Sequence, residues 1–121
     1  MNTTSIGRLG EDAASRYLAQ KGYRIVERNY NCRVAEIDII AYNTNGTLCF
    51  IEVKTRKNSN FGYPSEYVDN AKQHKIHLGA MSYIKQKSLD VEIRFDVIEV
   101  YTHKVGDKAK ITRINHIENA F

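Results

Sequence analysis

The sequence has little cysteine, no apolar run of membrane length and no recognisable leader. Its two cysteines, Cys32 and Cys49, form neither a C-x-x-C pair nor a zinc-type spacing with the four histidines, so we expect reduced thiols without a zinc site. No apolar run approaches the roughly 18 to 20 residues that span a bilayer, and Met1–Thr4 begins no basic and apolar leader region. These absences predict a cytoplasmic protein that does not associate with membranes.

Length and composition are those of one small domain. The chain has 121 residues, 42% of them apolar, which is enough for a single core, so we expect residues 1–121 to form one domain. Lys and Arg exceed Asp and Glu by 18 to 14, and the isoelectric point is about 9.1. This mild positive charge favours polyanions, but it does not distinguish a nucleic-acid-binding protein from an ordinary basic enzyme.

Hydrophobic periodicity predicts two helices separated by strands. Helices are expected over residues 5–21, ending at Gly22, and from Asp69 as N-cap to about Lys87. Strands are expected over residues 23–30, 36–42, 48–55, 92–101 and 110–117, with a polar loop over 57–63 before Pro64 and a turn over 104–108. The order αβββαβ, followed by one extra strand, predicts an α/β fold with a mixed central sheet flanked by helices.

The connection between the second and third strands allows two registers. A two-residue turn at Asn45-Gly46 would set Asp38 opposite Val53. A three-residue loop over 44–46, with Gly46 in the left-handed region, instead sets Asp38 opposite Glu52. We favour the second register because it separates apolar and charged side chains onto two faces. The apolar set is Ile37, Ile39, Ile51 and Val53, and the charged set is Glu36, Asp38, Glu52 and Lys54.

The charged set contains a pattern, Asp38 followed by Glu52-Val53-Lys54, that fits metal-assisted phosphodiester hydrolysis. Two carboxylates on neighbouring strands form a hard oxygen site suited to Mg²⁺ or Mn²⁺, and the backbone carbonyl of Val53 is a candidate third ligand. A lysine beside the ion can position the attacking water and neutralise phosphate charge. The same short pattern is also explained by a purely structural ion pair of Lys54 with Asp38 or Glu36.

Several further segments, together with this pattern, resemble the YraN-like family of bacterial proteins nearly end to end. They are Ile6–Ala14, Arg28–Tyr30, Glu36–Ile40, Phe50–Arg56, Phe61–Pro64, Arg94–Val97 and His116–Phe121. The resemblance implies a restriction-endonuclease-like domain of the PD-(D/E)xK group, distantly similar to archaeal Holliday junction resolvases, with an αβββαβ core.

The resemblance also implies roles for individual residues. Asp38 and Glu52 would be metal ligands, Lys54 the catalytic lysine, and Glu11 the acidic residue that resolvase-like members carry on the first helix. The chain departs from the family pattern at Ile37, where proline is usual, and at Ala35, where glycine is frequent.

The sequence thus predicts a metal-dependent nuclease, or alternatively a non-catalytic nucleic-acid-binding module or a protein-interaction domain of the same fold. DNA is the expected substrate, and the analogy with resolvases implies branched DNA and a twofold homodimer. Candidate contacts to the nucleic-acid backbone are Arg28, Arg56, Lys57 and Lys72. We expect no zinc at His74 and His77, and a structural rather than catalytic ion pair between Arg94 and Asp96.

Overall fold

The predicted order of helices and strands is confirmed in the computed structural model, which describes residues 3–57 and 68–121. Its elements are α1 (Thr3–Gln20), β1 (Arg24–Asn31), β2 (Glu36–Tyr42), β3 (Leu48–Lys57), α2 (Asn70–Lys87), β4 (Ile93–Val105) and β5 (Lys108–Ile117). Most of the predicted loop over 57–63, and Pro64, lie outside the described residues. Neither described helix is long and apolar enough to cross a membrane.

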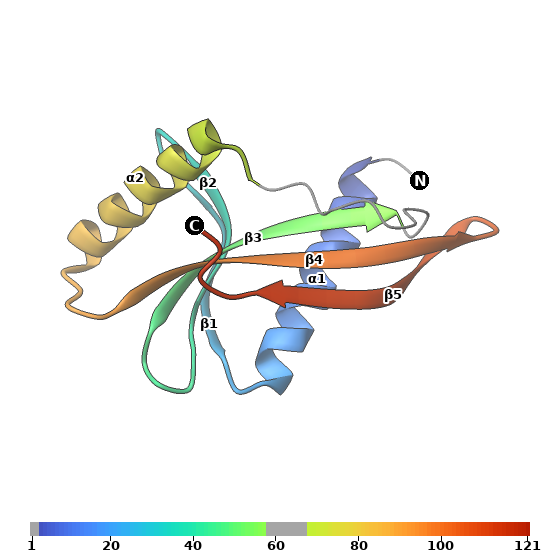
Figure 1. The fold of residues 1–121 in the computed structure, drawn as a ribbon, viewed down its shortest axis with the longest axis horizontal. Coiled ribbons are helices and arrows are strands. Elements are labelled where there is room, and N and C mark those ends of the chain that lie inside the picture. The colour runs from blue at the N-terminus through green and yellow to red at the C-terminus, as the bar shows by residue number, and fades with distance from the viewer. Residues whose placement is uncertain (1–2, 58–67) are drawn as a thin grey trace.

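One mixed sheet organises the chain, with strand order β1-β2-β3-β4-β5. Neighbouring strands are antiparallel except β3 and β4, which are parallel, because the chain passes through α2 between them. The two helices lie on opposite faces of the sheet (Figure 1). The α/β architecture with a helix-flanked mixed sheet is therefore as predicted.

Each sheet face carries its own apolar cluster. The cluster under α1 consists of Ala13, Ala14, Leu18, Ile39, Ala41, Cys49, Ile51, Ile98 and Val100. The cluster under α2 consists of Ile37, Ile40, Leu48, Phe50, Val68, Ile76, Ala80, Tyr83, Phe95 and Val97. Because β3 and β4 contribute to both clusters, the middle of the sheet is buried on both faces.

The three-residue register of the β2–β3 hairpin is confirmed. Ile39 pairs with Ile51 and Tyr42 with Leu48, which continues to Asp38 opposite Glu52. Gly46 has a φ of +84°, the left-handed conformation that the three-residue loop requires. The hairpin therefore brings the two carboxylates to the same level of the sheet.

The predicted placement of Ile37 with Ile39 and Ile51 was wrong. Ile37 packs in the α2 cluster, whereas Ile39, Ile51 and Val53 face α1. The backbone pairing of β2 with β3 extends only from Tyr42 to Ile39, so strict alternation is lost beyond it. Gly79 of α2 comes close there: a Cβ on this glycine would lie 3.4 Å from Ile37 Cδ1.

The predicted helix α2 is confirmed in its start and in its buried face. The Asp69 side chain caps the helix by accepting the Lys72 backbone N–H at 2.8 Å. Its buried residues are Ile76, Gly79, Ala80 and Tyr83. Lys72 begins this stripe, so its side chain is directed toward the sheet rather than away from it.

The C-terminal hairpin is longer than the sequence pattern indicated. Strands β4 and β5 continue to Val105 and Lys108, which pair with each other, so the turn is only Gly106-Asp107 rather than 104–108. The exposed polar residues in this part give no alternation with a buried face, so hydrophobic periodicity predicts strands that are shorter than the observed ones. The hairpin extends beyond the part of the sheet that α2 covers (Figure 1).

Candidate active site

Asp38 lies where β2 and β3 stop pairing through their backbones. Its Oδ2 accepts the backbone N–H of Val53 at 2.8 Å, so a carboxylate takes the place of a strand carbonyl. This bond draws the Asp38 side chain against β3. The predicted convergence of Asp38 with the Glu52-Val53-Lys54 segment therefore has a specific local cause.

Glu52 is buried, with 6% of its surface exposed, and it is paired with two lysines. Lys72 Nζ on α2 lies 2.7 Å from Glu52 Oε1, and Lys54 Nζ lies 3.8 Å from the same oxygen. The first contact is a short charge-assisted hydrogen bond, and the second is a looser ion pair. Glu52 is thus held between the second helix and its own strand.

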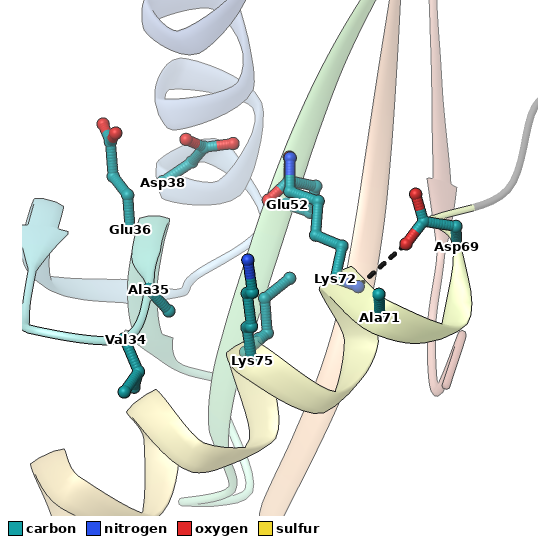
Figure 2. A pocket seen from close by; sticks show the side chains of 10 residues that line it. Val34, Ala35, Glu36, Asp38, Glu52, Asp69, Ala71, Lys72 and Lys75 are labelled. Carbon is teal, nitrogen blue, oxygen red and sulfur yellow. Dashed lines mark hydrogen bonds and ion pairs between the residues drawn. The ribbon is translucent and has the colours of Figure 1, made fainter.

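Asp38 and Glu52 line one cleft of about 450 Å³ between β2, β3 and the start of α2 (Figure 2). The other lining residues are Val34, Ala35, Glu36, Asp69, Ala71, Lys72, Lys75 and Ile76. Lys54 is not among them and lies beside Glu52 at the edge of the cleft. The cleft thus has a carboxylate wall from the sheet and a cationic wall from the helix.

The cleft disfavours the simultaneous ionisation of Asp38 and Glu52. Burial and then the charge of Glu52 raise the pKa of Asp38 to about 7, although the Val53 N–H favours ionisation. Burial acts to lower the pKa of Lys72, but its bond to Glu52 and the Glu52 charge together raise it. A proton, a lysine or a divalent cation relieves the repulsion between the two carboxylates.

The donor set of the cleft fits a hard divalent cation. Carboxylate oxygens on adjacent strands are ligands that Mg²⁺ and Mn²⁺ prefer, with water completing the shell. Within residues 3–57 and 68–121, no three His, Cys, Asp or Glu side chains are arranged to hold an ion. Glu36 and Asp69 also line the cleft. The ligand roles of Asp38, Glu52 and the Val53 carbonyl stay predictions.

Glu11 and Arg28, predicted for the metal and the nucleic acid, lie together at a second cleft of about 620 Å³ beside α1. Arg28 Nη2 lies 2.8 Å from Asp12 Oδ1 and 3.5 Å from Glu11 Oε1. The Glu11 charge still contributes to the raised pKa of Asp38. Glu11 therefore acts on the carboxylate site electrostatically, with Arg28 as its direct partner.

Arg56 and Lys57, the other predicted backbone contacts, lie at the end of β3. Arg56 Nε is 3.4 Å from Glu99 Oε2, and Glu99 has only 1% of its side chain exposed. Asn115 Nδ2 also donates to Glu99 Oε1 at 2.8 Å. Arg56 thus compensates a buried acid, whereas Lys57 is exposed at the strand end.

Sequence reasoning missed the Glu99 cluster and the pairing of Lys72 with Glu52. The signals were present: Glu99 interrupts the apolar run Val97-Ile98-Glu99-Val100, and Lys72 begins an otherwise small and apolar helix face. Each is a charge at a buried position, which requires a partner. The identity of that partner depends on the tertiary fold.

The expected ion pair between Arg94 and Asp96 is confirmed. Asp96 is fully buried and accepts two hydrogen bonds of 2.8 Å from Arg94. It also contacts His116 Nε2 at 2.8 Å and accepts the Asn119 N–H at 3.0 Å. His77 packs its ring on Phe95, with centroids 4.0 Å apart, and so belongs to the aromatic packing.

The element order, the mixed sheet and the convergence of Asp38 with Glu52-Val53-Lys54 define an α/β domain with a restriction-endonuclease-like core. The chain belongs to the family described as "Uncharacterised protein family UPF0102", whose model matches residues 10–100. This confirms the YraN-like resemblance.

Relatives match over nearly the full chain. A UPF0102 protein of Caldanaerobacter subterraneus is 45% identical over 100% of this chain and 98% of its own length. One of Clostridioides difficile is 46% identical over 100% of both chains. SfsA of Pyrococcus furiosus, solved in complex with Ca²⁺, is 14% identical with a TM-score of 0.44, covering 97% of this chain and 64% of its own. That likeness is too low to bear on function.

Proposed function

We propose that this protein is a Mg²⁺- or Mn²⁺-dependent nuclease that hydrolyses nucleic-acid phosphodiesters. The observation that carries the proposal is the convergence of Asp38 and Glu52 on one cleft, with the pKa of Asp38 raised to about 7. Pairs of carboxylates that disfavour each other's ionisation are common in functional sites. Their mutual repulsion does not stabilise the fold.

In this proposal Asp38 and Glu52 hold the cation. When bound there, the cation would supply electrostatic stabilisation of the phosphate and a lowered pKa of a coordinated water. Lys54, 3.8 Å from Glu52, orients the water and offsets the charge that develops on the phosphate oxygens. Lys72 on the opposite wall keeps Glu52 oriented and adds positive charge at the mouth of the cleft.

A second candidate is a nucleic-acid-binding module of the same fold without catalysis. The 2.7 Å bond between Lys72 and Glu52 favours it, because this lysine already compensates the buried carboxylate without any cation. The two candidates differ in whether Asp38 is needed for turnover or only for the charge of the cleft.

The substrate and the setting belong to the same proposal. We infer DNA, including branched DNA, as the substrate, and a cytoplasmic location. A twofold homodimer would let two copies act on the symmetric strands of a four-way junction. The mildly basic chain supports a polyanionic substrate, and its two free cysteines support the cytoplasmic location.

The test is a cleavage panel. Labelled single-stranded, duplex, flap and four-way-junction DNAs, with matched RNAs, are incubated with purified protein and Mn²⁺, and products are resolved on denaturing gels. The wild type should cleave at least one substrate, and Asp38→Ala should lose about a hundredfold or more of the rate. Asp90→Ala, which removes an exposed carboxylate, should cleave like the wild type.

Equal cleavage by wild type and Asp38→Ala would assign the activity to a contaminant and reject the nuclease. Binding of a substrate without cleavage under Mg²⁺ and Mn²⁺ would instead favour the non-catalytic module.

A further inference from the structure

The β4–β5 hairpin carries most of the net charge of the protein. Between His103 and Arg113 it has four Lys or Arg residues and one Asp, a net charge of +3, compared with +4 for the whole chain. The four cationic residues are Lys104, Lys108, Lys110 and Arg113, and all are exposed. The single acid, Asp107, lies in the turn at the tip.

Strand pairing sorts these cations between the two faces of the hairpin. Residues directly opposite each other in an antiparallel pair project from the same face. Val105 pairs with Lys108, His103 with Lys110 and Tyr101 with Arg113. A β-bulge next to Tyr101 keeps all three pairs on one face. Lys104 pairs with Ala109 and projects from the other.

The face with Lys108, Lys110 and Arg113 is the face that contains the carboxylate site. Along β4, alternate residues from Phe95 and Val97 through Glu99 and Tyr101 project toward the α2 side. Glu99 confirms this direction, because it meets Arg56 and Asn115 there. In Figure 1 the hairpin extends past the start of α2, on the side away from the C-terminal end of that helix.

The distance from the site to the tip suits a nucleic acid. Val97 pairs with Glu52, and from Val97 to Val105 the strand advances eight residues, or about 26 Å. That equals the rise of roughly eight base pairs of duplex. Between Val97 and Val105 the one acidic residue of β4 is Glu99, which is buried and compensated by Arg56. The exposed charge on this stretch of the α2-side face is therefore positive.

We infer that the α2-side face of the β4–β5 hairpin is a binding track for the phosphodiester backbone of a nucleic acid, formed by His103, Lys108, Lys110 and Arg113 and leading to the Asp38–Glu52 cleft. This inference rests on the proposed function for its substrate class. Arg113 is fixed for this role because its guanidinium lies over the Tyr101 ring, 4.2 Å from the centroid. The track places the backbone across the site without reading sequence.

The test measures binding without cleavage. Fluorescence anisotropy with a labelled duplex of about 20 base pairs, more than twice the track, and with one of its strands is recorded in EDTA. Lys108→Glu/Lys110→Glu should weaken binding by about a hundredfold and reduce the dependence of log K on log salt by about two. The matched control Lys104→Glu/Lys85→Glu has the same charge change away from the track and should weaken binding less than about threefold.

Each outcome decides the inference. Equal weakening in track and control variants would assign binding to net charge and overturn it, and so would a wild type that binds neither DNA. Lys108→Gln/Lys110→Gln, with unfolding midpoints for all variants, separates loss of charge from a disturbed hairpin. A track variant that binds normally in a protein that cleaves DNA would overturn the track and leave the nuclease intact, whereas loss of binding in the track variants alone supports the track.

Discussion

Two aspartates of the same sheet, Asp96 on β4 and Asp38 on β2, show opposite electrostatic behaviour. Burial opposes ionisation of Asp96, but hydrogen bonds from His116, Arg94 and the Asn119 N–H lower its pKa. Burial and then the charge of Glu52 raise the pKa of Asp38 to about 7, although one backbone N–H, that of Val53, favours its ionisation.

The difference separates a structural carboxylate from a candidate functional one. Around Asp96 the fold provides donors for both oxygens, and the ion is stabilised by the protein alone. Around Asp38 the fold leaves the ion under-compensated beside an open cleft. A site that is incomplete without an added charge is suited to binding a cation and an anionic substrate together.

The largest expected effect is on the Asp96 cluster. Asp96→Ala leaves Arg94 and His116 without their buried partner, so the free energy of unfolding at pH 7 should fall by about 3 to 5 kcal/mol. Because the pKa of Asp96 is lowered in the folded state, its contribution is present above the unfolded pKa near 3.9 and is lost as pH falls further. Urea unfolding from pH 3 to 7 measures both.

The control for this change is Asp90→Ala, an exposed position where roughly 0.5 kcal/mol or less is expected. If Asp96→Ala does not fold, Asp96→Asn keeps the shape and removes the charge. A variant that loses less than about 1 kcal/mol would contradict the structural assignment.

The next effect has the opposite sign. The folded-state pKa of Asp38 is about 7 against about 3.9 unfolded, so its proton stabilises the fold at low pH and this contribution is lost as pH rises through 7. Asp38→Asn should therefore be more stable than wild type by roughly 3 kcal/mol at pH 8 and equal to it near pH 4. Unfolding in EDTA at both pH values measures the difference, and a destabilised variant at pH 8 would refute it.

Binding of a divalent cation should distinguish the Asp38 site from the Asp96 cluster. A divalent cation held by Asp38 and Glu52 in the folded state alone should raise the free energy of unfolding by about 2.7 kcal/mol at a hundred times its dissociation constant. The midpoint is measured with Mn²⁺ and with EDTA. If Mn²⁺ stabilises the Asp38→Ala/Glu52→Ala variant by the same amount, the ion binds at another site.

The smallest effect on stability is expected at Lys54. Its ammonium is 3.8 Å from Glu52 and its side chain is 29% exposed, so Lys54→Ala should cost about 1 kcal/mol or less while metal affinity is kept. Cleavage, measured on the substrate that the panel reveals, should fall strongly if Lys54 positions the water. A loss of roughly 3 to 5 kcal/mol would instead make Lys54 a structural partner of the buried carboxylates.

Local patterns in the sequence were sufficient to predict the elements and the register of the site. Runs of β-forming residues over 36–42 and 48–55 predicted two strands, and the separation of apolar from charged side chains favoured the three-residue loop that sets Asp38 level with Glu52. Asp69 marked the first turn of α2, and the stripe from Lys72 to Tyr83 marked its buried face. These signals act within a few residues of the chain, where steric and capping preferences are strong.

Partners distant in sequence were decided by the tertiary structure alone. The sequence marked Lys72, Arg56 and Arg28 as cations, but their acidic partners Glu52, Glu99 and Asp12 follow from how α2, β4 and α1 pack on the sheet. The sequence likewise did not predict that Ile37 faces α2, or that β4 and β5 extend to a two-residue turn. A buried charge shows in the sequence that a partner is needed, whereas only three-dimensional packing determines which partner is within reach.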